Sequence, residues 1–150
     1  MSKATYAGLL DQMVAGGQPA QLTFAENVRK ECEEEASLPP AVIDTLRQAG
    51  LVSYRYATAR GLSTKVLAAY DLEMPNGLLP ICSDGEVDEF QLMPIGEVLA
   101  SIRDELPIWK PNSALVAIDF AMRHGFITFE SEPNYLEIAH LLRAGGMYST

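Results

Sequence analysis

Residues 16–38 read GGQPAQLTFAENVRKECEEEASL and contain signals for both ends of a helix. Thr23 precedes Glu26 by three residues, which is the spacing of a capping box. Leu38 is followed by two prolines, and the residue before a proline avoids helical dihedral angles. The sequence therefore predicts a helix over Phe24–Ala36.

The predicted helix carries an apolar stripe on one side. Ala25, Val28, Cys32 and Ala36 recur at helical spacing. Residues with this spacing lie on one face of a helix, so we expect them to be buried against a core.

Beside this stripe, three carboxylates share a second face of the helix. Glu31, Glu34 and Glu35 stand at positions i, i+3 and i+4. They repel one another, and we expect no basic residue to neutralise them from within one turn of the same stripe. A bound Mg²⁺ or Mn²⁺ ion would remove the repulsion, because these ions prefer oxygen ligands. The alternative is a solvated acidic face, which is what most glutamate runs are.

Residues 16–38 as a whole resemble the Nudix box, G-x5-E-x7-R-E-U-x-E-E-x-G-U, in which U is apolar. The metal-binding core of that box, E-x-x-E-E, is complete at residues 31–35. Three positions differ, with Leu22 in place of the first Glu, Lys30 in place of Arg and Ser37 in place of the last Gly. Lysine keeps the charge of arginine but not its planar fork, so the ligands are present while their supporting residues have changed.

Several further segments resemble the Nudix subfamily that is related to thiamin pyrophosphokinase. They are Lys3–Tyr6, Leu10–Gly17, Asp84–Val87, Lys110–Asn112, Arg123–Gly125 and Glu132–Ile138. The resemblance covers nearly the whole chain. It implies a metal-dependent hydrolase that cleaves the diphosphate of thiamin diphosphate, or of its oxidised analogues, to the monophosphate.

The resemblance also implies an α/β fold, a Nudix-type α/β/α sandwich with a mixed sheet and added C-terminal helices. In the family, two strands and a loop usually precede the segment that begins here at Ser2. We therefore expect the first strands of the sheet to be absent from this chain. An uncovered sheet edge can pair with a second copy, so we expect a homodimer. By length, residues 1–150 are expected to form a single domain.

Periodicity and turn residues predict the other elements. We expect helices over Pro40–Ala49, Pro94–Leu106, Asn112–His124 and Pro133–Arg143. Strands are expected over Leu51–Thr58, Val66–Glu73 and Val87–Met93, with a hairpin loop at Arg60–Ser63 and a turn at Pro75–Gly77.

Composition restricts the partners. The chain is 48% hydrophobic and has a net charge of −9, which argues against nucleic acid or an anionic membrane as partner. A small-molecule diphosphate would be repelled unless a metal ion bridges it to the protein. The chain has no apolar run long enough to span a membrane and no apparent signal peptide, and Cys32 and Cys82 are expected to be reduced thiols. These features predict a cytoplasmic protein.

The Nudix resemblance implies roles for residues inside and outside the acidic run. Glu34 and Glu35 are expected to act in catalysis as well as in metal binding, and Glu86 is the candidate base that activates water. The alternative is that Glu86 is a loop carboxylate in water. Gly16 and Gly17 are expected to bind substrate or metal through the backbone, because glycine allows close approach.

Two polar residues near the middle of the chain are further candidates for substrate binding. Lys110 and Asn112 could contact a phosphate or the thiamin ring. The alternative for Asn112 is that it caps the following helix, and that alternative is favoured.

Other chemistries find little support. The sequence has no phosphate-binding G-x-x-x-x-G-K-[ST] loop, no dinucleotide fingerprint and no nucleophile elbow. Two alternatives to the thiamin substrate stay open. One is a Nudix hydrolase of another nucleoside or organic diphosphate, and the other is a Nudix-fold protein that binds its ligand without cleaving it.

Overall fold

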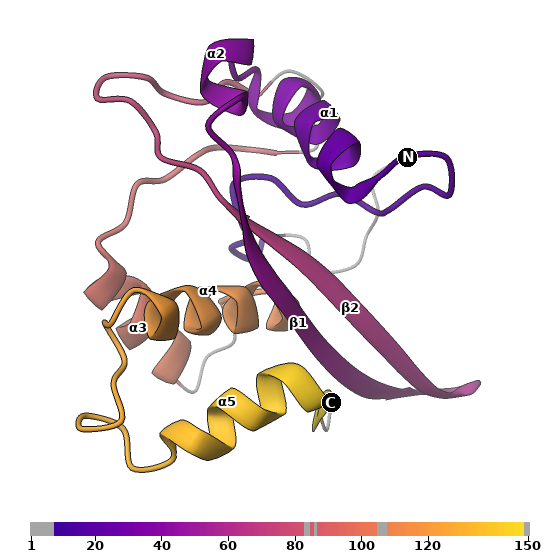
Figure 1. Cartoon of the computed structure of the whole chain (residues 1–150), viewed down its shortest axis with the longest axis vertical. Helices are drawn as coiled ribbons and strands as arrows, with labels where there is room; N and C mark the ends of the chain where they lie inside the picture. Colours follow the sequence, from indigo (N-terminus) through magenta and orange to yellow (C-terminus); the bar gives the residue numbers. More distant parts are fainter. Residues whose placement is uncertain (1–7, 83–84, 86, 105–107, 149–150) are drawn as a thin grey trace. The chain divides into compact units, whose positions relative to one another are not determined.

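The computed structural model describes residues 8–82, 85, 87–104 and 108–148. It is a mixed α/β structure, as the sequence predicts (Figure 1). The elements follow the order α1 (Phe24–Ala36), α2 (Pro40–Ile43), β1 (Arg47–Thr58), β2 (Gly61–Asp71), α3 (Ile95–Arg103), α4 (Pro111–Arg123), α5 (Tyr135–Ala144) and β3 (Gly146–Tyr148).

The strands that the structure describes form one mixed sheet in the order β2-β1-β3. Only two residues separate β1 from β2, so these neighbours form an antiparallel hairpin (Figure 1). β3 pairs with β1 in parallel, with Tyr54 opposite Gly146. The mixed sheet agrees with the predicted fold class. β3 itself was not expected, because three residues are too few to show an alternating pattern.

The chain divides into two compact units, each built from two separate stretches. The first unit comprises Met1–Gln48 and Tyr70–Leu92, and the second comprises Ala49–Ala69 and Met93–Thr150. β1 and β2 therefore each contribute residues to both units. The expectation of one domain over residues 1–150 stays a prediction.

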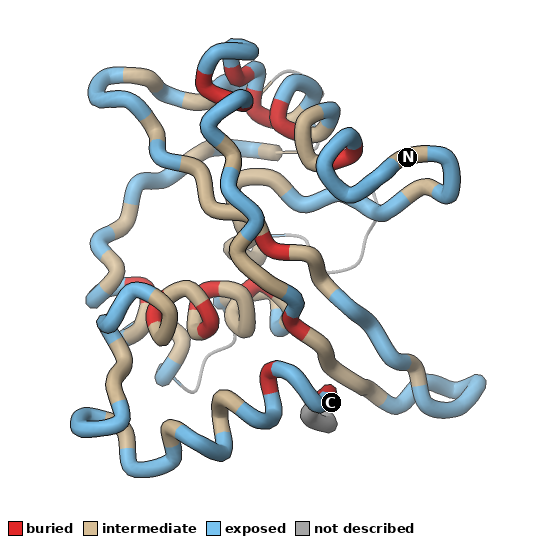
Figure 2. Tube along the Cα trace, viewed as in Figure 1, coloured by how far each residue is buried: buried red, intermediate tan, exposed pale blue. Residues whose placement is uncertain are grey.

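The first unit has its core along α1 and α2 (Figure 2). Cys32, Ala36, Leu38 and Ile43 are buried together, and partly buried residues from the other stretch of the unit, such as Leu72, pack against them. Two of these four residues belong to the predicted apolar stripe of the helix. The hydrophobic pattern thus placed the core correctly along the second half of α1.

The first turn of α1 departs from the predicted stripe. Ala25 is exposed, whereas Asn27 is buried. The predicted bounds of the helix are confirmed, and the capping box is present, with Glu26 N–H donating to Thr23 Oγ1 at 3.2 Å and Thr23 N–H donating to Glu26 Oε2 at 2.8 Å. The core does not reach Ala25, and the loop that precedes the helix covers Asn27 instead, through a hydrogen bond from Asn27 Nδ2 to the carbonyl of Gly17.

The second unit contains α3, α4 and α5 together with most of the β1–β2 hairpin. Its buried apolar residues include Val52, Val98, Ala117, Ala121 and Leu142. The only fully buried charged side chain among the described residues is Asp119, which lies 2.8 Å from Arg123 and 2.6 Å from Arg143. Because Arg143 belongs to α5, this carboxylate joins α4 to α5.

The end of α5 is also tied to β1. Ser53 Oγ donates to the carbonyl of Arg143 at 2.7 Å, and Arg55 Nε donates to the carbonyl of Gly145 at 2.7 Å. The last carbonyls of a helix have no partner within the helix, so these strand side chains satisfy them.

Three predictions about elements are wrong, namely the helix over Pro40–Ala49, the hairpin loop at Arg60–Ser63 and the strand over Val87–Met93. The helix expected over Pro40–Ala49 ends at Ile43, where Thr45 Oγ1 bonds back to the carbonyl of Val42 at 2.7 Å, and strand pairing takes over from Arg47. The hairpin turn lies at residues 59–60 and β2 already begins at Gly61.

The described residues of the predicted strand 87–93 are irregular. Asp88 and Glu89 explain this result in part, because acidic residues are disfavoured in strands. The turn at Pro75–Gly77 is confirmed by the hydrogen bond from Leu78 N–H to the carbonyl of Pro75 at 3.1 Å. No helix in the described ranges is long and apolar enough to cross a lipid bilayer.

Candidate metal centre

The loop before α1 is fastened to the helix by two hydrogen bonds. The N–H of Ala15 donates to Glu35 Oε2 at 2.9 Å. The carbonyl of Gly17 accepts a hydrogen bond from Asn27 Nδ2 at 3.2 Å. The two helix residues are separated by two turns, so the loop runs antiparallel to α1 between them.

Between these two hydrogen bonds, Gly16 lies against the side chain of Glu31. A Cβ at position 16 would overlap Cγ, Cδ and Oε1 of Glu31, so with Glu31 in this position only glycine fits. A Cβ on Gly17, in contrast, would meet nothing within 4 Å. Of the two predicted backbone sites, the structure thus brings Gly16 to a predicted metal ligand.

Three helix residues spaced by four, Asn27, Glu31 and Glu35, form what we call the glutamate stripe. Residues at this spacing lie one above another on a helix. The side chain of Glu31 is 15% exposed, whereas that of Glu34 on the same helix is 54% exposed. The stripe therefore places a partly buried carboxylate beside a closely packed backbone.

Lys30 interacts with the same acidic face. Its Nζ lies 2.5 Å from Glu34 Oε2 and 3.7 Å from Glu31 Oε1. The hydrogen bond that Lys30 donates to the carboxylate of Glu34 raises the pKa of Lys30 above its usual value. The expectation that no basic residue neutralises this face is therefore wrong, because a lysine side chain reaches the carboxylate one turn further along.

The carboxylates predicted as ligands thus have protein partners in this structure. Among the described residues, no three carboxylate, imidazole or thiol groups are gathered so that they could hold a metal ion. The ligand roles of Glu31, Glu34 and Glu35 stay a prediction.

The residues of the glutamate stripe nevertheless fit a hard divalent cation. The two glutamates of the stripe offer carboxylate oxygens, which Mg²⁺ and Mn²⁺ prefer as ligands. Because Gly16 has no Cβ, the loop backbone lies directly against the carboxyl group of Glu31. Asn27 Oδ1 is buried without a hydrogen-bond partner in the part of the chain that the structure describes. Sequence reasoning missed Asn27, and the only signal was its position four residues before Glu31.

The cysteine next to Glu31 is not a candidate ligand. Cys32 is 2% exposed and belongs to the core of the first unit. Burial, followed by the neighbouring carboxylate of Glu35, raises the pKa of its thiol to about 11. Since the thiolate is the form that binds metals, Cys32 stays a neutral core residue near pH 7.

Lys110 and Asn112 lie in the second unit, at the N-terminus of α4. Lys110 is the N-cap residue, and Asn112 follows Pro111 inside the first turn. The interpretation of Asn112 as the helix cap is wrong, because proline favours the first helical position and starts the helix one residue earlier. Contact of these two residues with substrate stays a prediction, as does the role of Glu86, which lies outside the described residues.

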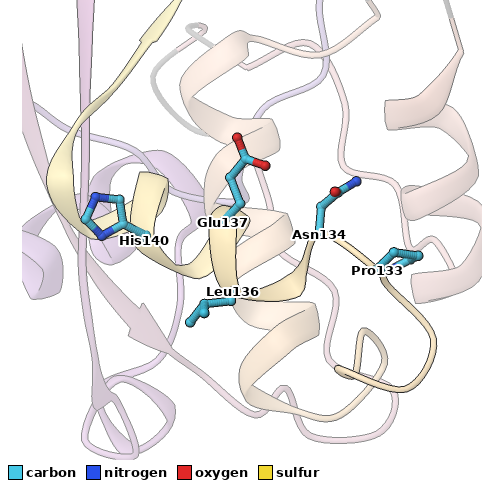
Figure 3. A pocket seen from close by; sticks show the side chains of 5 residues that line it. All are labelled: Pro133, Asn134, Leu136, Glu137 and His140. Carbon is cyan, nitrogen blue, oxygen red and sulfur yellow. The ribbon is translucent and has the colours of Figure 1, made fainter.

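A pocket of about 590 Å³ opens on the second unit beside the first turns of α5 (Figure 3). Its lining residues are Pro133, Asn134, Leu136, Glu137 and His140. It contains none of the predicted site residues, and only Glu137 and His140 carry ionisable groups. Two such groups are too few for a complete ligand set. This pocket is therefore a weaker candidate for a metal centre than α1, which we call the acidic helix.

Comparison with known proteins gives relatives over nearly the whole chain. It is 42% identical over 145 residues to Nudix hydrolase 24, chloroplastic, of Arabidopsis thaliana, covering 97% of this chain and 39% of that protein. It is 43% identical over 143 residues to Nudix hydrolase 20, chloroplastic, of the same plant, covering 95% and 38%. An uncharacterised protein of Saccharomyces cerevisiae is 40% identical over 149 residues, covering 91% and 43%. No family model matches the chain.

The chain spans about two fifths of the length of these relatives. The acidic helix lies well inside the compared region, since the similarity to the first two covers 97% and 95% of the chain. The comparison therefore concerns the segment that contains Gly16 and the glutamate stripe.

Proposed function

The chain belongs to the Nudix family, and from that premise we propose that it hydrolyses the diphosphate of a small organic molecule with the help of a divalent cation. The proposal is supported by the relatives named Nudix hydrolase and by the fit of the acidic helix to Mg²⁺ or Mn²⁺. Because those relatives are longer than this chain, the activity is proposed for the segment that they share with it.

The strongest support for the proposal is the contact between Gly16 and Glu31. Gly16 packs against the carboxyl group of Glu31 so closely that no side chain could stand at position 16 with Glu31 in place. A solvated acidic face needs no such contact, because its carboxylates extend into water. The packing therefore favours a built site over the alternative of a solvated glutamate run.

In the proposed site, Glu31, Glu34 and Glu35 hold the cation, and the backbone at Gly16 is a further oxygen donor. A bound Mg²⁺ ion neutralises charge on phosphate oxygens and lowers the pKa of a bound water. The carboxylates of the chain are also proposed to orient the attacking water and accept its proton, and the candidates for this role are Glu34, Glu35 and Glu86.

Charge explains why a cation is needed before substrate can bind. The protein has a net charge of −9, and the acidic helix concentrates negative charge on one face. A diphosphate is itself anionic, so repulsion would keep it away from bare carboxylates. Lys30, which pairs with Glu34, must exchange partners when a divalent cation binds there.

The proposed substrate is thiamin diphosphate or one of its oxidised analogues, with the monophosphate as product. This narrower proposal rests on the resemblance of the segments outside the acidic helix, among them Lys110–Asn112, to the thiamin-related subfamily. Lys110 and Asn112 are proposed to contact the phosphate or the ring. A homodimer and a cytoplasmic location complete the proposal, and the two free cysteines fit a reducing compartment.

The test is phosphate release from oxythiamin diphosphate, thiamin diphosphate and a panel of nucleoside diphosphates, with and without Mg²⁺. We expect release that depends on Mg²⁺ and is fastest with the thiamin compounds. Faster release from a nucleotide would contradict the proposal of a thiamin substrate but would still support diphosphate hydrolysis. Saturable binding without release at any Mg²⁺ concentration would instead identify a binding protein.

A matched pair of variants connects the activity to the helix. Glu34→Gln removes one proposed ligand, and we expect it to abolish release while the helical signal in circular dichroism stays unchanged. Glu33→Gln removes an equal charge from an exposed position next to it and should leave release within about twofold of the wild type. Full activity in Glu34→Gln would contradict the assignment of Glu34 to the metal site.

A further inference from the structure

Asn27 is a buried amide on a helix whose neighbouring face is acidic. The residue is 5% exposed. A buried amide costs free energy unless its donors and acceptor are used, and here Oδ1 has no partner among the described residues. An apolar side chain of similar size would avoid that cost. Packing alone therefore does not account for an asparagine at this position.

Among the described residues, the contact that distinguishes Asn27 from an apolar residue is its hydrogen bond to the loop. Nδ2 donates to the carbonyl of Gly17 at 3.2 Å, across ten residues of chain. On the other side of Gly16, the N–H of Ala15 donates to Glu35 at 2.9 Å. Gly16 is thus held on both flanks while it presses against Glu31.

These contacts follow the helix turn by turn. Glu31 lies one turn beyond Asn27, about 6 Å along the helix axis. Release of the Gly17 carbonyl would free one flank of Gly16, and the loop could then move away from Glu31. The carboxylate would gain rotamers and lose its fixed position relative to the loop backbone.

We propose that Asn27 is a positioning residue of the metal centre, which holds the Gly16–Gly17 backbone against Glu31 without itself binding the cation. The inference rests on the proposed function, since it requires a cation at the acidic helix. Groups that orient metal ligands in this way change metal affinity by roughly 10- to 100-fold when they are removed. The main effect is therefore expected on cation affinity.

The experiment measures the Kd of Mn²⁺ by electron paramagnetic resonance on the full 150-residue chain. Asn27→Leu removes the amide and keeps the branched shape and the number of heavy atoms, and Asn27→Ala removes the side chain beyond Cβ. We expect the Kd to rise about tenfold in both, with the unfolding midpoint of Asn27→Leu near that of the wild type because a buried unpaired oxygen has also been removed. A Kd within twofold of the wild type would overturn the proposal.

Two controls separate positioning from stability. Ile43→Val weakens the same core, so it should lower the unfolding midpoint while the Kd for Mn²⁺ of the folded protein stays unchanged. Asn76→Ala removes an exposed amide from a turn of the same unit and should change neither quantity. If Ile43→Val weakened Mn²⁺ binding as much as Asn27→Leu, the effect would be one of stability and the proposal would be wrong.

A second readout does not depend on any variant. In the wild type, the side-chain NH₂ resonance of Asn27 should exchange slowly with solvent and shift on addition of Mg²⁺, because one N–H is buried and bonded to Gly17. Rapid exchange and no shift would count against the positioning role even if every Asn27 variant failed to fold.

The Mn²⁺ measurement also keeps this inference apart from the proposed activity. A wild-type chain that binds Mn²⁺ but releases no phosphate would overturn the hydrolase proposal, and the Asn27 variants would still decide the positioning role. A wild-type chain that binds no Mn²⁺ would overturn both.

Discussion

Gly16 and Glu31 are packed together so tightly that a methyl group on the glycine would occupy the position of the glutamate side chain. The contact joins a loop to the middle of α1. One hydrogen bond on each side of Gly16, at Ala15 and at Gly17, holds the loop in place. Four predictions follow from this contact and from the other polar contacts of the two units.

Gly16→Ala should separate site geometry from stability. The atoms that a new Cβ would meet are at the mobile end of Glu31, so the side chain can rotate away. We therefore expect the free energy of unfolding to change by no more than about 0.5 kcal/mol. Phosphate release at limiting Mg²⁺ should fall by about tenfold or more, because Glu31 leaves its place beside the loop.

Gly17→Ala is the matched control for this change. A Cβ there has no neighbour within 4 Å, so both activity and stability should stay close to those of the wild type. Equal losses in the two variants would mean that loop flexibility, rather than the contact with Glu31, is what matters.

Lys30→Met should strengthen cation binding at low ionic strength. Lys30 pairs with Glu34 and lies 3.7 Å from Glu31, so it competes with a divalent cation for both carboxylates. Exposed ion pairs are weak, so we expect a modest fall of about two- to fivefold in the half-saturating Mg²⁺ concentration. This concentration is measured by titrating the rate of phosphate release against Mg²⁺ in both proteins.

Salt provides the check on this explanation. The difference between Lys30→Met and the wild type should shrink when NaCl is raised to about 1 M, because exposed charges are then screened. Lys65→Met removes an exposed lysine from β2 and should leave the Mg²⁺ dependence unchanged. Weaker Mg²⁺ binding in Lys30→Met would show that Lys30 supports the site instead of competing in it.

Acid should remove the contribution of the capping box. The backbone N–H and hydroxyl of Thr23 donate to Glu26 and hold the pKa of its carboxyl below the usual value of 4.5. A lowered pKa in the folded state stabilises the fold above pH 4.5, and this contribution disappears as the pH falls through the lowered pKa. Glu26→Gln should therefore unfold at a lower temperature than the wild type at pH 7, with the difference closing toward pH 3.

The comparison uses thermal unfolding midpoints of both proteins over that pH range. Glu33→Gln serves as the control, because Glu33 lies in the last half of the same helix and takes no part in the cap. A gap between Glu26→Gln and the wild type that stays constant down to pH 3 would contradict the titration of Glu26 as its cause.

Asp119→Ala should be the most destabilising of these changes. Asp119 is 1% exposed and pairs with Arg123 and Arg143, so its removal leaves the two guanidinium groups without their shared carboxylate. The expected cost is about 3–5 kcal/mol in the free energy of unfolding, measured with urea. Glu130→Ala, at an exposed position, should cost less than about 0.5 kcal/mol, and a similar result for Asp119→Ala would show that the pairs are dispensable.

Local signals predicted the acidic helix well. Thr23 and Glu26 mark its start, the prolines after Leu38 mark its end, and the observed bounds are those predicted. Capping and proline effects act within one turn, so they can be read from neighbouring residues without knowledge of the fold. The weaker predictions, such as the extension of α2 to Ala49, fell where strand pairing with distant residues overrode local preference.

The sequence by itself determined the helix, the spacing of Glu31, Glu34 and Glu35, and through them the resemblance to the Nudix box, because each depends on residues a few positions apart. Only the tertiary structure decided that Gly16 meets Glu31, that Lys30 pairs with Glu34, and that Asn27 holds the loop. Two of these contacts join residues ten or more positions apart, and the third depends on which of several neighbouring carboxylates a long side chain selects. Such choices are made by packing and hydrogen bonding in the folded chain, where a buried polar group must find its partner wherever the fold places one.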